Sequence, residues 1–131
     1  MARLSLDYTD QADRPVQRFD GRNELAEAYR EARRTPKEHE AFLEVACHGM
    51  LITIFDGSPT SPVQAMTEDR EPPYLLALSP VPAPGTTDFF PDGHHTEIAN
   101  RNTLLAADVD RIVLDFIETG ELTEEFAWEH V

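Results

Sequence analysis

The stretch LAADVDRIVLDFIETG, residues 105–120, decides how the rest of this sequence is interpreted. Its large apolar side chains recur every three or four residues, which is the spacing of one buried stripe on an α-helix. The stripe consists of Leu105, Val109, Ile112, Val113, Phe116 and Ile117. Gly120 suits the end of this helix, because glycine readily adopts the left-handed conformation of a C-terminal cap. We therefore expect a helix here, with Phe116 and Ile117 in the core.

Apolar runs on both sides of this helix have the composition of strands. These runs are residues 41–47, 50–55, 74–78 and 125–131. Only His48 and Gly49 separate the first two runs, so we expect a tight hairpin between them. In the last run, Phe126 and Trp128 are two residues apart and are expected on the same side of a terminal strand.

The N-terminal third predicts one more strand and a second helix. Residues 3–8 alternate weakly as a short strand, whereas residues 10–20 are polar and are expected to form a loop. Residues 23–34 have helical periodicity, with Asn23 as the expected N-cap. The apolar positions of this helix are Leu25, Ala28, Tyr29 and Ala32. The opposite face carries Arg30, Arg33 and Arg34.

Two segments in the middle of the chain complete the expected order of elements. Residues 60–73 are polar and are expected to form a loop. Residues 86–90 and 94–99 are expected to pair as a hairpin across Pro91, Asp92 and Gly93. Hairpin connections favour an antiparallel sheet. We therefore expect an α+β protein, a single domain over residues 1–131 in which two main helices pack on one face of an antiparallel sheet.

The charge of the chain limits the classes of partner. The 131 residues include 25 acidic and 11 basic side chains, which give a formal charge of −14. Residues 41–131 alone hold sixteen acids and three basic side chains. Nucleic acids and anionic membranes are poor partners for such a surface, because binding to phosphate needs basic side chains. A negative field instead attracts a basic protein partner.

Cellular location is expected from the absence of export and membrane signals in the sequence. No apolar run approaches the ~20 residues that cross a bilayer. The segment MARLSLDYTD lacks the apolar region of a secretory signal peptide. The single Cys47 excludes a disulfide within the chain. We expect a cytoplasmic protein.

The sequence offers no constellation that we would assign to catalysis. It contains neither a glycine-rich phosphate loop nor a Gly-x-Ser-x-Gly nucleophile motif. Cys47 and His48 are adjacent, and neighbours on a strand point to opposite faces, so they cannot act as nucleophile and base. The segment from Asp92 to Glu97 includes His94 and His95, but two ligands on a turn do not close a tetrahedral metal site. We expect no catalytic residue, no metal and no cofactor.

Several segments resemble a known family. A polar strand, HHTEIANRNTLL (residues 94–105), precedes a helix that ends in DFIETGEL (residues 115–122), and FAWEHV (residues 126–131) follows. These segments are similar to the first-numbered family of bacterial polymorphic-toxin immunity proteins. Members also have an early helix near a Glu-Leu pair, here Glu24 and Leu25, and a central hairpin with a core like residues 51–54. Glu121 and Leu122 stand where members usually carry Arg-Pro.

The resemblance implies a function without catalysis. A member of this family binds its cognate secreted toxin in the producing cell and blocks the toxin's active site. Such toxins commonly act on nucleic acids, as nucleases or deaminases. The resemblance therefore implies a basic toxin domain as the partner, and an acidic chain suits a cleft that is built to hold phosphates.

Two acidic segments in expected loops are the candidate toxin-binding residues, because loops on a rigid scaffold commonly carry function. The candidates are Glu68, Asp69, Glu71, Asp88, Phe89, Phe90, Asp92 and Glu97. The two phenylalanines are candidates for an apolar anchor. Because adjacent strand residues face opposite ways, one of them is expected to pack into its own hairpin.

Two other functions remain open from the sequence. The first is a small metal-dependent or ligand-binding enzyme that uses the turn from Asp92 to Glu97. The second is an acidic adaptor that mimics nucleic acid without a toxin partner. Bound zinc in the purified protein would favour the first, and a neighbouring gene for a basic toxin domain would favour the immunity protein over both.

Overall fold

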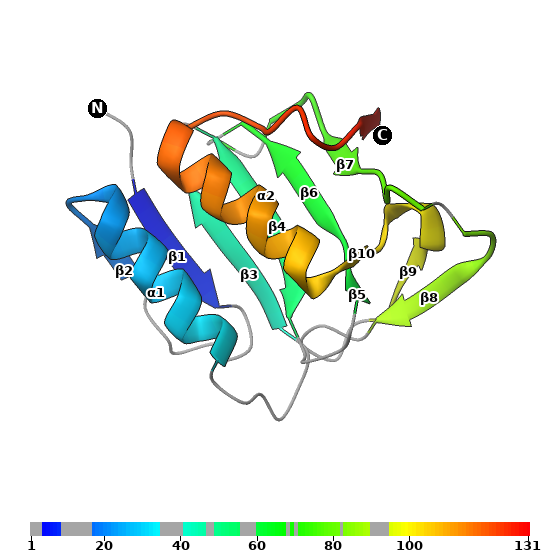
Figure 1. Cartoon of the computed structure of the whole chain (residues 1–131), viewed down its shortest axis with the longest axis horizontal. Coiled ribbons are helices and arrows are strands. Elements are labelled where there is room, and N and C mark those ends of the chain that lie inside the picture. The colour runs from blue at the N-terminus through cyan, green and yellow to red at the C-terminus, as the bar shows by residue number, and fades with distance from the viewer. Residues whose placement is uncertain are drawn as a thin grey trace.

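Over the residues that it describes, the computed structural model has two α-helices on one face of a seven-stranded antiparallel sheet (Figure 1). It describes residues 4–8, 17–34, 41–46, 49–55, 60–67, 69, 71–81, 83–89 and 95–131. The helices are α1 (Arg22–Arg34) and α2 (Ala106–Thr119). The expected α+β architecture is confirmed.

The large sheet has the strand order β11-β7-β6-β4-β3-β1-β2. Its strands are β1 (Leu4–Tyr8), β2 (Gln17–Phe19), β3 (Ala41–Ala46), β4 (Met50–Phe55), β6 (Val63–Met66), β7 (Leu75–Ala77) and β11 (Trp128–His130). Every pairing between neighbours is antiparallel. The expected hairpin across Gly49 is confirmed, with Ala46 opposite Met50.

Two small sheets complete the described structure. One pairs β5 (Thr60–Ser61) with β10 (Leu104–Leu105), and the other pairs β8 (Thr86–Phe89) with β9 (Thr96–Ala99). The short 3-10 helix η2 (Asn100–Asn102) links β9 to β10. The β8–β9 pair confirms the hairpin expected around Pro91, although the turn itself lies outside the described residues.

The core lies between the helices and the sheet. Val45, Leu51 and Ala65 are successive register partners across β3, β4 and β6, so they lie on the same face. From α2 come Val109, Ile112, Val113, Phe116 and Ile117, all at most 3% exposed. From α1 come Leu25, Tyr29 and Ala32. The helical periodicity therefore identified the buried faces correctly, apart from Leu105.

Leu105 is 60% exposed and lies in β10 rather than in α2. The chain is still extended at this residue, with φ −62° and ψ 149°, because it pairs with Thr60. Sequence spacing places Leu105 one turn before Val109, but that turn does not form. The other end of the helix is as expected, since Gly120 has φ 78° and its N–H donates to the Phe116 carbonyl at 2.7 Å.

The two expected loops contain strands that the sequence did not reveal. Residues 10–20 include β2, and residues 60–73 include β5 and β6. β6 is a central strand between β4 and β7, but only Val63 and Ala65 face the core. Two small apolar residues on either side of Gln64 are a weak sequence signal for a strand. The strand is stabilised instead by its pairing with β4 and β7 on both sides.

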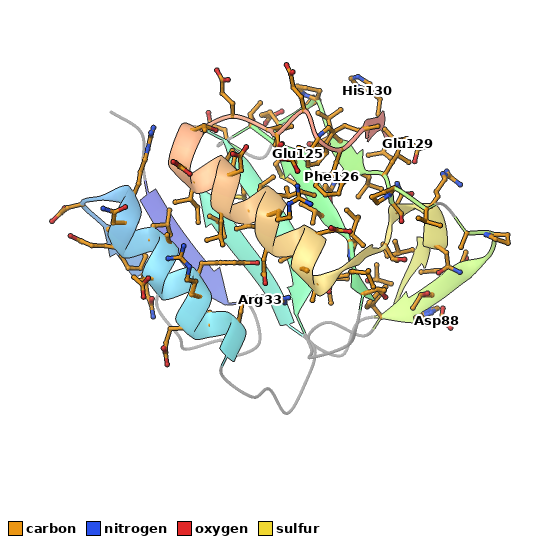
Figure 2. The ribbon with its side chains drawn as sticks, viewed as in Figure 1. Arg33, Asp88, Glu125, Phe126, Glu129 and His130 are labelled. Carbon is orange, nitrogen blue, oxygen red and sulfur yellow. The ribbon has the colours of Figure 1, made fainter. Side chains whose placement is uncertain are left out.

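Helix α1 begins one residue earlier than expected. Leu25 N–H donates to the Gly21 carbonyl at 3.2 Å, so Asn23 lies in the first turn and is not the N-cap. Arg33 does not face solvent. Its Nε donates to the Asp110 carboxylate of α2 at 3.0 Å, and Figure 2 shows the side chain extended from α1 toward α2.

The Asp110 carboxylate also accepts a hydrogen bond from the hydroxyl of buried Tyr29, with 2.7 Å between the two oxygens. This contact joins the two helices. Asp110 is therefore a structural acid, unlike the exposed acids of the surface.

We predict that Phe116→Ala lowers the free energy of unfolding by about 3–5 kcal/mol, because the substitution removes a buried phenyl ring and leaves a cavity in the core. Chemical denaturation measures this loss. Leu105→Ala is the matched control and should change stability little, since Leu105 is exposed. Equal losses in the two variants would contradict the assigned helix face.

We also predict that Thr53→Val stabilises the protein. Thr53 is 2% exposed, and its Oγ1 has no hydrogen-bond partner among the described residues. Removing an unsatisfied buried hydroxyl should raise stability by about 1 kcal/mol and the melting temperature by roughly 4 °C. In the control Thr103→Val, the Oγ1 that donates to the Asn100 carbonyl is lost, so that variant should melt at a lower temperature. A melting temperature of Thr53→Val below that of the parent would overturn the prediction.

Candidate functional site

The β8–β9 hairpin brings two of the candidate acids together. Asp88 and Glu97 are register partners on adjacent strands, and both are exposed. His95 Nε2 lies 2.9 Å from Asp88 Oδ1. The two acids give this hairpin a local excess of negative charge. Like charges directly opposite each other on a sheet destabilise the strand pair.

Only one of the two aromatic candidates of the hairpin lies within the described residues. Phe89 is 2% exposed and packs inward, so it is not available as an anchor for a partner. Phe90 and Asp92 lie outside the described residues, as does His94. Cys47, His48 and Glu68 lie outside them too.

The second acidic segment lies in the connection between β6 and β7. Asp69 and Glu71 are exposed. Glu71 N–H donates to Thr67 Oγ1 at 2.9 Å, and Thr67 N–H donates to the Glu71 carbonyl at 3.2 Å. These two bonds fix the backbone of Glu71 beside Thr67. In Figure 1 this connection lies at the top and the β8–β9 hairpin at the right, so the fold does not join the two acidic segments into one patch.

The structure places an apolar cavity beside Thr67 that the sequence did not predict. Its volume is about 280 Å³, and it lies between the C-terminal end of α2 and the ends of β4, β6 and β7. Its lining includes Met50, Ala65, Met66, Leu75, Phe116 and Leu122. The lining residues come from four separate segments of the chain, and for this reason no local pattern could have found the cavity. We call it the α2-end cavity.

More acids lie at the end of α2, one in its last turn and one just beyond it. Glu118 and Glu121 are exposed, and Glu121 is preceded by Gly120 and followed by Leu122, both of which line the α2-end cavity. The carbonyl end of a helix is itself electronegative, so these carboxylates add to a field of the same sign. The nearby cation on α1 is Arg22, whose Nη1 donates to the Glu118 carbonyl at 2.8 Å.

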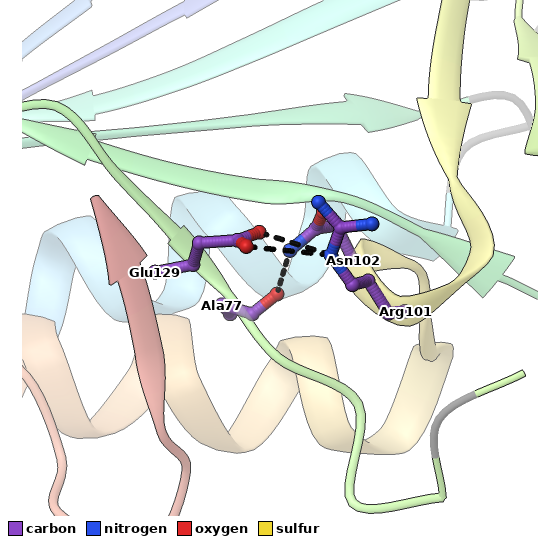
Figure 3. A network of polar contacts seen from close by, with 4 residues as sticks. All are labelled: Ala77, Arg101, Asn102 and Glu129. Carbon is purple, nitrogen blue, oxygen red and sulfur yellow. Dashed lines mark hydrogen bonds and ion pairs between the residues drawn. The ribbon is translucent and has the colours of Figure 1, made fainter. Parts of the chain in front are cut away.

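A polar network ties η2 to the C-terminal edge of the sheet (Figure 3). Arg101 Nε donates to both carboxylate oxygens of Glu129 at 3.3 Å, and buried Asn102 donates to the Ala77 carbonyl at 3.3 Å. The hydrogen bond from Arg101, with a further one from Asn102, holds the pKa of Glu129 below its ordinary value of 4.5. The ionised carboxylate thus stabilises this edge above that pH, and the contribution is lost as pH falls through the lowered pKa.

Among the residues that the structure describes, no three His, Cys, Asp or Glu side chains cluster to hold a metal ion. Of the candidate ligands between Asp92 and Glu97, the structure describes His95 and Glu97, and both are exposed. Nor does any helix within the described ranges have the length and apolar character that crossing a membrane needs.

We predict that Arg101→Gln raises the pKa of Glu129 toward 4.5, because the guanidinium that favours the carboxylate is removed. Titration of the Glu129 side-chain carboxyl carbon by NMR measures this change. Arg18→Gln is the control, since Arg18 lies on β2 at the other end of the sheet order. An unchanged Glu129 titration in Arg101→Gln would rule out Arg101 as the cause.

Comparison with known proteins gives no assignment: no protein-family model matches this chain, and no curated protein matches it either.

Proposed function

We propose that this protein is a cytoplasmic immunity protein that binds a cognate secreted toxin and neutralises it. The toxin is a basic domain that acts on nucleic acid, as a nuclease or deaminase. The chain occludes the toxin's substrate cleft with acidic side chains, and performs no catalytic step of its own.

The observation that carries the proposal is the exposure of acids that no described cation neutralises. Asp69, Glu71, Glu97, Glu118 and Glu121 are exposed, and no ion pair joins them to a cation within the described residues. An acidic surface of this kind attracts a cleft that has evolved to hold phosphates. The same surface repels nucleic acid, so the protein does not itself bind the toxin's nucleic-acid substrate.

The hairpin acids support the same conclusion. Asp88 and Glu97 lie directly opposite each other on adjacent strands, where like charges repel, and His95 lies beside Asp88 alone. A basic partner that approaches the hairpin is attracted by both carboxylates, which raises its association rate. Binding of a cationic partner is therefore more favourable at this pair of acids than at isolated acids.

The residues that carry the sequence resemblance have structural roles. In the motif of residues 116–120, Phe116 is buried and Gly120 caps α2. Trp128 is partly buried against the core. These residues build the scaffold, and the acids on its connections are the part that would differ between members with different toxins.

The test is co-expression with the toxin domain encoded by a neighbouring gene. We expect rescue of growth, co-purification of the two proteins, and loss of toxin activity in the purified complex. Association should slow by about tenfold or more between roughly 50 mM and 500 mM NaCl, while dissociation changes little, because salt screens steering rather than close contacts.

A toxin-inactive variant allows the binding measurement without toxicity, and surface plasmon resonance gives both rate constants. Failure to rescue against every toxin domain encoded beside the gene would overturn the proposed function. Rescue with a salt-independent association rate would overturn the electrostatic part of it.

A further inference from the structure

The α2-end cavity combines an apolar interior with an acidic rim. Its volume, about 280 Å³, falls at the lower limit of cavities that bind small molecules. That size suits one large apolar side chain. Its apolar lining residues include Met50, Ala65, Leu75, Phe116 and Leu122.

The rim is held in place by the fold. Glu71 is fixed through its two backbone hydrogen bonds with Thr67, a lining residue. Glu121 lies between two lining residues, Gly120 and Leu122, in the chain that follows α2. Gly120 is fixed in turn by its bond to the Phe116 carbonyl. Exposed glutamates thus adjoin lining residues on two separate segments of the chain, and we call these two carboxylates the rim.

We infer that the α2-end cavity receives one apolar side chain of the partner, flanked in the partner's sequence by arginine or lysine. The inference rests on the proposed function for the identity of that partner as a toxin. The apolar side chain fills the interior, and the flanking cations contact Glu71 and Glu121. Buried apolar anchors with charged neighbours are the usual centres of binding energy in protein interfaces.

The two parts of this site affect the rate constants differently. Rim carboxylates attract the partner's cations at a distance and so raise the association rate, and their contacts in the complex also slow dissociation. The anchored side chain is desolvated only in the complex, so its loss raises the dissociation rate. The α2-end cavity therefore predicts a separation of effects that the overall negative charge does not.

A peptide experiment tests the cavity without the toxin. The probes are two capped pentapeptides, Arg-Arg-Phe-Arg-Arg and Arg-Arg-Ala-Arg-Arg, added to the ¹⁵N-labelled protein. We expect the phenylalanine peptide to shift the amides of Gly49, Thr67 and Gly120, which line the cavity, and the alanine peptide to shift them far less. Equal shifts from both peptides, or shifts spread over all acidic segments, would overturn the inference.

A filled-cavity variant tests the same site with the toxin. Ala65→Met inserts a flexible side chain into the cavity and should raise the dissociation rate about tenfold or more. The matched control is Ala26→Met, which fills a different cavity of about 270 Å³ between α1 and α2 and should leave dissociation unchanged. Melting temperatures verify that both variants fold. If Ala65→Met melts early, Leu122→Asn replaces it, because that change makes one partly exposed wall polar.

Charge reversal separates the rim from the overall field. Glu71→Lys/Glu121→Lys should slow association and also speed dissociation, whereas Asp88→Lys/Glu97→Lys changes the net charge equally and should affect association alone. Equal dissociation rates in the two double variants would overturn the assigned contacts. Wild-type protein that binds the phenylalanine peptide but no toxin would overturn the proposed function and leave the cavity assignment supported.

Discussion

The packing of α2 against the sheet is the contact on which the rest of the structure depends. Its stripe of five buried residues meets Leu51, Val63, Ala65 and Ala77 of three neighbouring strands. A helix of 14 residues is marginal in water by itself, and a sheet with an apolar face is not stable when that face is exposed. Each therefore requires the other. Because the helix comes late in the chain and the strands come early, the fold forms from segments that are distant in sequence.

The end of this helix also shapes the surface. Gly120 reverses the chain through a left-handed residue, and the chain then returns along the end of the sheet to β11, which pairs with β7 (Figure 1). Phe116 closes the core on one side and forms a wall of the α2-end cavity on the other. The same side chain thus contributes to stability and to the surface that we assign to the partner.

Acidic side chains have two distinct uses in this structure. Asp110 accepts hydrogen bonds from Tyr29 and Arg33 between the helices, and Glu129 accepts from Arg101 at the edge of the sheet. These acids hold elements together. Glu71, Glu97 and Glu121 instead lie exposed on connections and on the hairpin. Charge counted along the sequence cannot separate the two groups, because the difference lies in which cations the fold brings near.

The sequence by itself determined the two helices, the buried positions of α2, the β3–β4 and β8–β9 hairpins and the α+β class. Each of these follows from a local period or a turn signal, and such signals act over a few residues. Only the tertiary structure decided that β6 is a central strand, that Leu105 is extended and that Asp110 is a structural acid, because these outcomes depend on partners far away in the chain. The same reason applies to the candidate site. The sequence pointed to Asp69 and Glu71, but the α2-end cavity beside them is built from four segments and exists only after they pack.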